Sequence, residues 1–362
     1  MKRTVKFEAF WDALIIEPCD YFSVVSTFNY WDGLSFKTTL WKETPGSQRI
    51  EIEGQEFSSP YSDDGCLYFA DTGNHRISKR DVSYMIESTL FLDKIGSNGT
   101  GDDEFKFPSG IAVDLNDRDF IYVTDRDNYR IERRRKSSLA LVWKVNLESG
   151  QKPIGITIDR TYVYITIQTA DTSKHCIQKR KKSTGSLIWE IGTWGTGNDQ
   201  FKNPSGITTN RNNAYNDYDD YIYIADTGNH RIQKRLKSNG SYVSQIGTQG
   251  AGNDQFESPY GINAYADYLV VADTGNHRIH KRFCTDLSYI AKAGTQGAGN
   301  DQFESPKGIT ILMPWPYYIF VVDTGNHRIV SLDWDLVYIS QLGSQGAGND
   351  EFESPIGIGI YI

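Results

Sequence analysis

The amino-acid sequence predicts an all-β fold, a six-bladed β-propeller with four-stranded blades and a small β module before it. Three observations favour this architecture. The chain repeats itself about every 50 residues, a period typical of propellers and repeat arrays. Every repeat after the first holds four short runs with the composition of β-strands, separated by Gly, Asn and Ser turns. The first repeat lacks one of these runs, and the chain ends on a copy of the missing run.

The repeat is visible as an eight-residue motif built around an aspartate. It reads ADTGNHRI at 70–77, 225–232 and 272–279, VDTGNHRI at 322–329, and in weaker copies TDRDNYRI at 124–131 and ADTSKHCI at 170–177. The aspartates lie 46 to 55 residues apart, and they are Asp71, Asp125, Asp171, Asp226, Asp273 and Asp323. Six motifs predict six blades.

The unit around Asp226 illustrates the four expected strands. Strand a is the Gly-Ile segment after Pro204, and strand b is YIYIAD (221–226). A Thr-Gly-Asn turn leads to strand c, HRIQKR (230–235), and a further polar turn leads to strand d, YVSQIG (242–247). Short strands joined by tight turns are antiparallel. No helical period of 3.6 residues appears, which argues against a helical solenoid.

The two ends of the chain complement each other. Pro60 precedes Asp71 by only 11 residues with no Gly-Ile segment between them, so the first unit lacks strand a. The tail FESPIGIGIYI (352–362) is a strand a with no b, c or d after it. We expect the tail to pair beside Leu67–Asp71 and close the ring, because closure removes the unpaired edges of an open array.

Residues 1–55 do not follow the repeat, although they contain strand-like runs. We interpret them as a separate β module that serves anchoring or assembly, and residues 56–362 as the propeller. The alternative for the first segment is a degenerate seventh blade. A surplus of large aromatic residues on a small module marks an interaction surface. Trp11, Trp31 and Trp41 are the candidate anchoring residues.

The pairing of DTGNHRI with Phe-x-x-Pro-x-Gly-Ile resembles the NHL-repeat family of propellers over roughly residues 57–362. Two copies depart from the pattern, since Tyr129 replaces the histidine of one, and Lys174 and Cys176 replace the asparagine and arginine of the other. The resemblance implies a structural role for the motif side chains. In the four full copies these are Asp71, Asn74, His75, Arg76, Asp226, Asn229, His230, Arg231, Asp273, Asn276, His277, Arg278, Asp323, Asn326, His327 and Arg328.

Several expectations concern how these side chains bond. Each motif histidine is expected to bond within its own blade, and each motif arginine to reach a carboxylate of a neighbouring blade. The histidines of different blades are expected to lie too far apart to share a zinc ion. His280 is expected at the surface. The GAGND loop lacks the ligand spacing of a calcium loop and the Lys-Ser/Thr of a phosphate loop, so we expect it to shape the crossing between blades.

The innermost strands offer little for catalysis. They carry Asp114, Asp159, Asn210 and Asn263 but no Glu or His. Such a ring could hold a cation, yet Asp and Asn also end strands in ordinary turns. No catalytic, cofactor or metal residues are therefore assigned, and the chain is expected not to be an enzyme.

The two faces of the ring are expected to differ. The b–c turns and interblade crossings share a nearly uniform face, whereas the a–b and c–d turns share a variable one, where binding usually resides. The candidate binding residues on the variable face are Arg133, Arg134, Arg135, Lys136, Lys179, Arg180, Lys181, Lys182, Tyr215, Tyr218, Trp315 and Tyr317.

Composition narrows the possible partners. The net charge of -8 disfavours a nucleic-acid binder, and no apolar run of about 18 residues predicts a membrane span. Cys19, Cys66, Cys176 and Cys284 are widely spaced and are expected to be free thiols in packed sites. The basic N-terminus lacks an uninterrupted apolar core, so no secretion signal is expected. We expect the protein in the cytoplasm or in an assembled particle such as a virion.

The predicted function is a non-enzymatic binding or assembly scaffold that presents variable loops to a protein or a glycan. A structural component of a larger particle, viral or phage, fits this prediction. Two alternatives stay open. One is a propeller enzyme of the hydrolase, lactonase or lyase type with a metal in its channel. The other is an RNA-binding propeller, whose affinity would fall steeply with salt.

Overall fold

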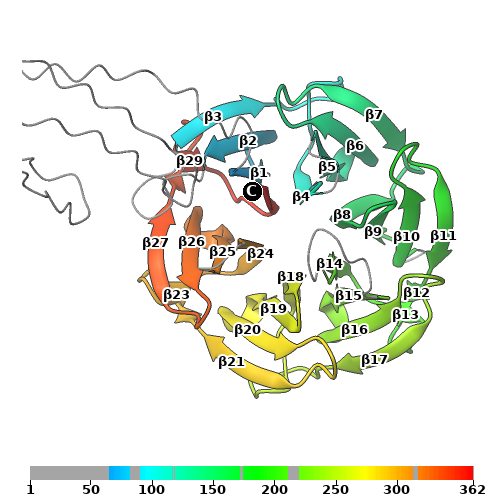
Figure 1. Cartoon of the computed structure of the whole chain (residues 1–362), viewed down its shortest axis with the longest axis vertical. Helices are drawn as coiled ribbons and strands as arrows, with labels where there is room; N and C mark the ends of the chain where they lie inside the picture. The colour runs from blue at the N-terminus through cyan, green and yellow to red at the C-terminus, as the bar shows by residue number, and fades with distance from the viewer. Residues whose placement is uncertain are drawn as a thin grey trace, which may run out of the picture. The chain divides into compact units, whose positions relative to one another are not determined.

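The computed structural model describes residues 65–81, 90–115, 117, 119–171, 174–210, 220–312 and 317–361. The predicted β module at 1–55 lies outside the described residues. Within them, the chain folds into six four-stranded antiparallel sheets arranged around a common axis (Figure 1). The prediction of an all-β six-bladed propeller is confirmed. No helix of the described residues has the length and apolar character needed to cross a membrane.

Each blade runs from an innermost to an outermost strand. Blade 1 combines β30 (Ile358–Tyr361) with β1 (Cys66–Asp71), β2 (Arg76–Asp81) and β3 (Leu90–Ile95). Blades 2 and 3 are β4 (Pro108–Val113), β5 (Phe120–Asp125), β6 (Arg130–Arg135) and β7 (Leu141–Asn146), then β8 (Lys152–Ile158), β9 (Tyr162–Gln168), β10 (Cys176–Lys181) and β11 (Leu187–Ile191). Blades 4 and 5 are β14 (Pro204–Thr209), β15 (Tyr221–Asp226), β16 (Arg231–Leu236) and β17 (Tyr242–Ile246), then β18 (Pro259–Tyr265), β19 (Tyr268–Asp273), β20 (Arg278–Phe283) and β21 (Tyr289–Ala293). Blade 6 is β24 (Pro306–Leu312), β25 (Tyr318–Asp323), β26 (Arg328–Asp333) and β27 (Tyr338–Leu342).

The crossings between blades contain short parallel strand pairs. These are β12 (Thr193–Trp194) with β13 (Gln200–Phe201), β22 (Thr295–Gln296) with β23 (Gln302–Phe303), and β28 (Ser344–Gln345) with β29 (Glu351–Phe352). The Thr-Gly-Asn turns of blades 4, 5 and 6 form single 3₁₀ turns, and the histidine that follows adopts a left-handed backbone, with φ of 56° at His230. This turn reverses the chain between strands b and c.

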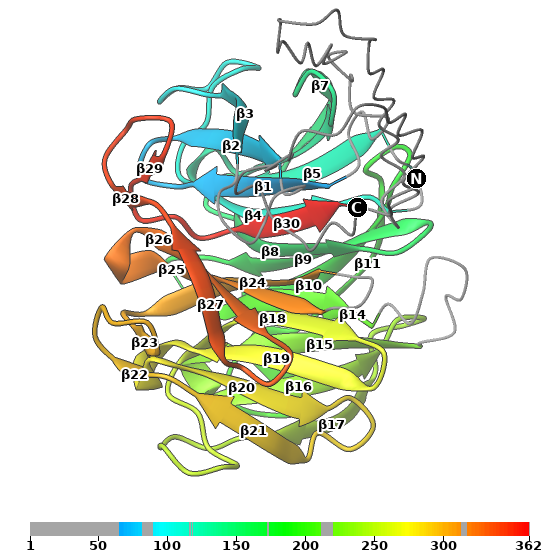
Figure 2. The same cartoon turned by 60° about the vertical axis from the view of Figure 1, so that its left-hand side comes forward.

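The ring closes as the sequence predicts. Strand β30 pairs antiparallel with β1, and the register places Leu67 opposite Ile360 and Phe69 opposite Ile358. Figure 2 shows the two strands side by side although they come from opposite ends of the described chain. The backbone of Ala70 adds two hydrogen bonds to the tail, from its N–H to Gly357 and from Ile356 to its carbonyl. Blade 1 is therefore built from both ends.

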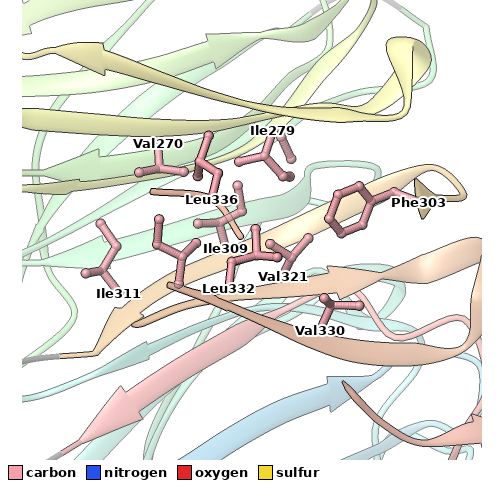
Figure 3. Packing of buried hydrophobic residues seen from close by; sticks show 11 residues of the cluster. Val270, Ile279, Phe303, Ile309, Ile311, Val321, Val330, Leu332 and Leu336 are labelled. Atoms are coloured by element: carbon pink, nitrogen blue, oxygen red, sulfur yellow. The ribbon is translucent and has the colours of Figure 1, made fainter. Parts of the chain in front are cut away.

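The core consists of apolar layers between successive blades. In the layer between blades 5 and 6, Val270 and Ile279 pack with Ile309, Val321 and Leu336 (Figure 3). Strand b of each blade is buried along most of its length, on both faces, because each sheet has a neighbour on either side. Removal of this apolar surface from water supplies the main driving force for folding.

A ring of glycines sets the spacing of the innermost strands. A Cβ atom on Gly261 would lie 1.7 Å from the carbonyl oxygen of Lys307, and one on Gly357 would lie 2.2 Å from that of Ser109. The Pro-x-Gly glycine of each blade therefore has no room for a side chain, because it lies against the backbone of the next blade. The second contact joins the C-terminal tail to blade 2 and completes the ring.

Candidate functional site

The motif aspartate organises a buried hydrogen-bond network, which blade 5 illustrates. The Oδ2 atom of Asp273 accepts hydrogen bonds from Asn276 Nδ2 at 2.8 Å and from Arg278 Nε at 2.7 Å. Its Oδ1 atom accepts one from the backbone N–H of Glu257 at 2.6 Å. Burial raises the pKa of Asp273, although these three donors oppose the rise. The same network forms around Asp71, Asp125, Asp226 and Asp323.

The motif arginine holds the crossing that enters its own blade. Arg278 donates to the backbone carbonyls of Ala251, Gly252 and Gln255, which lie in the crossing that contains GAGND and leads into strand β18. The expectation that this arginine reaches a neighbouring carboxylate is wrong. Its carboxylate partner is Asp273 of the same strand pair, and the neighbouring crossing offers carbonyls instead. Glycine-rich crossings expose such carbonyls because they have few side chains to cover them.

The motif histidine holds the next crossing. His230 of blade 4 accepts a hydrogen bond at Nδ1 from the backbone N–H of Ser258, which leads into blade 5, at 3.1 Å. The expectation of a bond within the same blade is therefore wrong, because the left-handed turn directs the ring toward the following blade. The equivalent bonds join His75 to Phe107, His175 to Asn203, His277 to Ser305 and His327 to Ser354. Each crossing between blades 4 and 5, 5 and 6, and 6 and 1 is thus held from both sides.

Replacing His230 with alanine should lower the free energy of unfolding by about 1–3 kcal/mol, because the N–H of Ser258 loses its acceptor. Urea denaturation of the purified variant measures this loss. The described residues contain no group of three or more His, Cys, Asp or Glu side chains placed to hold a metal ion. Elemental analysis of the wild-type protein and the variant tests the structural role of His230. Stoichiometric zinc in the wild-type protein that is lost in the variant would contradict it.

Blade 3 departs from the motif in a way that the sequence did not reveal. The register places Ile167 opposite Cys176, where blade 4 has Asp226 opposite Arg231. Both residues of the apolar pair are buried. The assignment of Asp171 as the aspartate of this blade is therefore wrong, since it lies exposed in a longer turn after the end of β9. A well-packed apolar pair can replace a buried ion pair without loss of stability.

His280 lies in the core rather than at the surface. Its side chain has no solvent exposure, and neither ring nitrogen has a hydrogen-bond partner within the described structure. Its Nε2 atom lies 3.8 Å from Asp273 Oδ2. Burial, together with the positive charges of Arg278 and Arg282, lowers the pKa of His280 to about 3. In blade 4 the same strand position holds Gln233, which donates to the motif aspartate at 3.1 Å.

Substituting His280 with glutamine should stabilise the protein in acid. Unfolded histidine gains a proton as the pH falls below 6.5, whereas folded His280 does so only near 3, so wild-type stability is lost as pH falls through this window. We expect the advantage of the variant to grow by about 2 kcal/mol between pH 7 and pH 5. Urea unfolding of both proteins at the two pH values measures it. Parallel pH dependences would show that His280 is not buried in its neutral form.

The basic runs on the predicted binding face are largely buried. Arg134 stacks on Phe105 at 4.8 Å and donates to the carbonyl of Leu139, and Lys179 lies 3.9 Å from the ring centroid of Tyr162. The structure buries Arg134, Lys136, Lys179 and Lys182, leaves Arg133 and Arg180 partly covered, and exposes Arg135 and Lys181. Four of the eight basic candidates are therefore covered by the protein itself, because both faces of strand c pack against neighbouring blades. Tyr215, Tyr218 and Trp315 lie outside the described residues, as do Trp11, Trp31, Trp41 and Cys19.

A cavity of about 430 Å³ occupies the centre of the ring. Isoleucines from all six innermost strands line it, and so do Tyr260, Lys307 and Asn263. The other polar residues predicted on these strands are held elsewhere. Those contacts are Asp114 with Lys182 at 2.8 Å, Asp159 with the hydroxyl of Tyr164 at 2.8 Å, and Asn210 with the carbonyl of Ala266 at 2.6 Å. No Asp, Glu or His is found among the lining residues that the structure describes.

Five aromatic rings extend from this cavity across blades 5 and 6, and we call them the aromatic strip. Tyr265 and Tyr317 line the cavity, with ring centroids 5.6 Å apart. Trp334 contacts Tyr317 at 5.3 Å and Tyr268 at 5.2 Å, and Tyr268 stacks on Phe283 at 5.7 Å. Phe283 at the far end is 38% exposed. Only Tyr317 was a sequence candidate, because the five residues come from separate turns of two blades.

The remaining cysteines of the described chain, Cys66, Cys176 and Cys284, are buried free thiols. Burial raises the pKa of the Cys176 thiol far above its ordinary value. A thiol held in its neutral form is a poor nucleophile, so Cys176 adds no reactive group to the cavity or to the aromatic strip.

Comparisons with solved structures agree on the class of fold. A chain of a nidogen/laminin complex matches with a TM-score of 0.60 and 16% identity, covering 82% of this chain and 99% of that chain. A protein of unknown function from Bacteroides caccae matches with a TM-score of 0.57 and 11% identity, with the same coverages. Streptogramin B lyase matches with a TM-score of 0.53 and 16% identity, covering 82% of this chain and 84% of that chain.

The fold and these likenesses define the protein as a six-bladed β-propeller. Identities this low establish the fold and not the activity. No protein-family model matches the sequence, and no curated protein sequence matches it significantly.

Proposed function

We propose that the protein is a non-enzymatic binding module, a propeller of the NHL-repeat type, which recognises a protein or a glycan through the aromatic strip. The observation that carries this proposal is the continuous run of rings from Tyr265 to Phe283. Tyrosine and tryptophan dominate the energetics of binding surfaces, because they bring large areas at a low cost in side-chain entropy. The strip belongs to the face of a–b and c–d turns, where the repeats differ most.

Two further considerations support binding over catalysis. The motif side chains, which would be the natural candidates for chemistry, are engaged in the crossings between blades. The described lining of the central cavity supplies no carboxylate or imidazole for general acid–base work. A chain in a nidogen/laminin complex has the same fold, so a propeller of this kind can take part in a complex between proteins.

A photo-cross-linking amino acid at position 283 tests the proposal. We expect it to capture a protein partner or a glycan, whereas the same cross-linker at position 243, an exposed site on the outer strand β17, captures neither. A glycan array and a panel of purified candidate proteins separate the two classes of partner. Phe283→Ser should weaken the binding found by at least tenfold, and Val243→Ser should not. Equal capture at both positions, or metal-dependent turnover of a bound ligand, would contradict the proposal.

We further propose that residues 1–55 attach the propeller to a larger assembly, in a virion or in the cytoplasm. The support is their content of large aromatic residues, together with a ring that closes through the C-terminal tail. A chain of residues 56–362 should be a soluble monomer by light scattering, and the intact chain should self-associate or dock onto a partner. If both are monomers and the shorter chain is unfolded, the segment belongs to the propeller.

A further inference from the structure

The mouth of the central cavity opposite the aromatic strip carries positive charge. Lys307 occupies the middle position of Pro-x-Gly at the start of β24, and Tyr260 occupies it at the start of β18. Tyr265, at the other end of β18, is five residues further along the strand, a separation of roughly 16 Å at about 3.3 Å per residue. The two ends of the cavity lining are thus chemically distinct, and the innermost strands run from one end to the other.

Lys307 is the one charged side chain among the described residues that line the cavity. Its Nζ atom lies 5.4 Å from the ring centroid of Tyr260. None of the described residues pairs with this ammonium group through a carboxylate or a hydrogen bond. Partial burial, with the nearby positive charge of Arg126, lowers the pKa of Lys307. A partly desolvated cation without a counter-charge is costly, and a bound anion would relieve that cost.

Arg126 adds to this positive mouth. It occupies the motif position at which Thr72, Thr227, Thr274 and Thr324 donate to a proline carbonyl of the next blade. Arg126 departs from that pattern, and its guanidinium lies over the Phe107 ring at 5.2 Å from the centroid, outside the lining of the cavity. Its positive charge still opposes the rise in the pKa of Tyr260 that burial causes.

The acidic group beside Arg126 does not cancel this charge. Asp127 is shared between Arg126 at 3.2 Å and Lys152 at 3.0 Å, so the three side chains keep one net positive charge. Together with Lys307, which lines the cavity, these side chains carry two net positive charges. A cleft with one sign of charge concentrates ligands of the opposite sign.

The walls beyond the mouth consist mainly of isoleucines, with the polar side chains of Thr157, Thr208, Asn263 and Thr310 among them. Ile262 and Ile309, with the isoleucines of the other four innermost strands, line the cavity. The volume of about 430 Å³ falls in the range of small-molecule sites. We propose that the cavity binds a small organic anion, whose carboxylate or phosphate head lies between Lys307 and Tyr260 and whose apolar body lies along the isoleucines. The head of the anion lies at the end of the cavity away from Tyr265 and Tyr317, the two rings of the aromatic strip that also line it.

Isothermal titration calorimetry of the full chain tests the proposal. Four small probe molecules are titrated at constant ionic strength. Hexanoate and hexyl phosphate represent the two head groups, hexanol lacks the charge, and acetate lacks the body. We expect at least one of the two amphipathic anions to bind with 1:1 saturation, and the comparison between them identifies the preferred head. Hexanol and acetate should bind at least tenfold more weakly. Failure of both amphipathic anions to bind, or equal binding of hexanol, would overturn the proposal.

Variants locate the site. Lys307→Gln should weaken binding of the preferred anion at least tenfold, and Arg126→Thr, which restores the residue of the other blades, should weaken it severalfold. Lys292→Gln is the matched control, because Lys292 is an exposed lysine on the outer strand β21. Thermal melts verify that each variant is folded. Unchanged affinity in both Lys307→Gln and Arg126→Thr would place the anion elsewhere and contradict the assignment. Phe283→Ser, which should weaken binding of a protein or glycan partner, should leave the affinity for the anion unchanged. The two proposals can therefore be contradicted independently of each other.

Discussion

A chain that ends at Glu351 should lose the closed ring and aggregate or melt at a much lower temperature. The deletion of 352–362 removes Phe352, Ile356, Ile358 and Ile360, all of which are buried. Burial of each such side chain contributes about 1.5–3 kcal/mol. At a few degrees per kcal/mol for a domain of this size, the melting temperature should fall by roughly 10 °C or more.

The deletion also exposes the edge of a strand. Strand β1 loses its partner β30, and the edge it presents can pair with other chains. Differential scanning calorimetry and light scattering measure the two effects. A synthetic peptide of residues 352–362, added to the truncated chain, should restore part of the lost stability and serves as the control. A truncated chain that stays monomeric and melts like the intact one would mean that the ring does not depend on its C-terminal strand.

Replacing Asp273 with alanine should be among the most damaging single substitutions. It leaves the buried guanidinium of Arg278 without its carboxylate and removes acceptors from Asn276 and the backbone of Glu257. Breaking a buried ion pair by removing one partner costs about 3–5 kcal/mol. Asp171→Ala is the matched control, because this aspartate carries the same sequence signature but lies exposed, where substitutions change stability by less than about 0.5 kcal/mol. Equal losses in the two variants, measured by urea unfolding, would refute the difference between blade 3 and the others.

The architecture was predictable because its determinants are local and repeated. Pro-x-Gly occurs in all six blades and Asp-Thr-Gly-Asn in four of them, and each fixes a backbone conformation through its own chemistry. The closure of the ring was also predictable. The first unit lacks a strand after Pro60 and the tail at 352–362 is an additional strand, so the tail can fill the vacant position in blade 1. The hydrogen-bond partners of the motif side chains were harder to predict from the sequence. The partners of His230 and Arg278 in the crossings are backbone groups, which the residue types alone do not identify.

Burial on two sides explains most of the wrong expectations. In an isolated antiparallel sheet, an alternating strand with many Lys and Arg exposes one face to water. Here neighbouring blades cover both faces, so His280 and Arg134 are buried. The side chain of Lys179 is buried as well, with its ammonium group over the ring of Tyr162. The error at Asp171 has another origin. The pairing of β9 with β10 sets the register of this blade. The turn between the two strands is longer than in the other blades, so Asp171 lies past the end of the paired residues, although its sequence matches the motif.

The candidate sites were the least predictable part of the molecule. The aromatic strip joins Tyr265 to Phe283 through residues of two blades, and the positive mouth joins residues from blades 2, 5 and 6. A signal was nevertheless present in the variation between repeats. The middle residue of Pro-x-Gly is small or aliphatic in four blades, whereas Tyr260 and Lys307 are the exceptions. Deviations from a repeat that serves packing mark the positions where a scaffold carries its function.

The sharing of blade 1 by the two ends of the chain is tested most directly by a disulfide. The register of β1 and β30 places Cys66 directly opposite Tyr361, and opposed residues of an antiparallel pair have the Cα separation that a disulfide requires. Tyr361→Cys should therefore form a cross-link to Cys66 under mild oxidation, which mass spectrometry detects as a peptide pair joining the two ends. Ile360→Cys, whose position is opposite Leu67, should form none with Cys66. Cross-linking that is absent from Tyr361→Cys in the folded protein, or equal in the two variants, would contradict the closed ring.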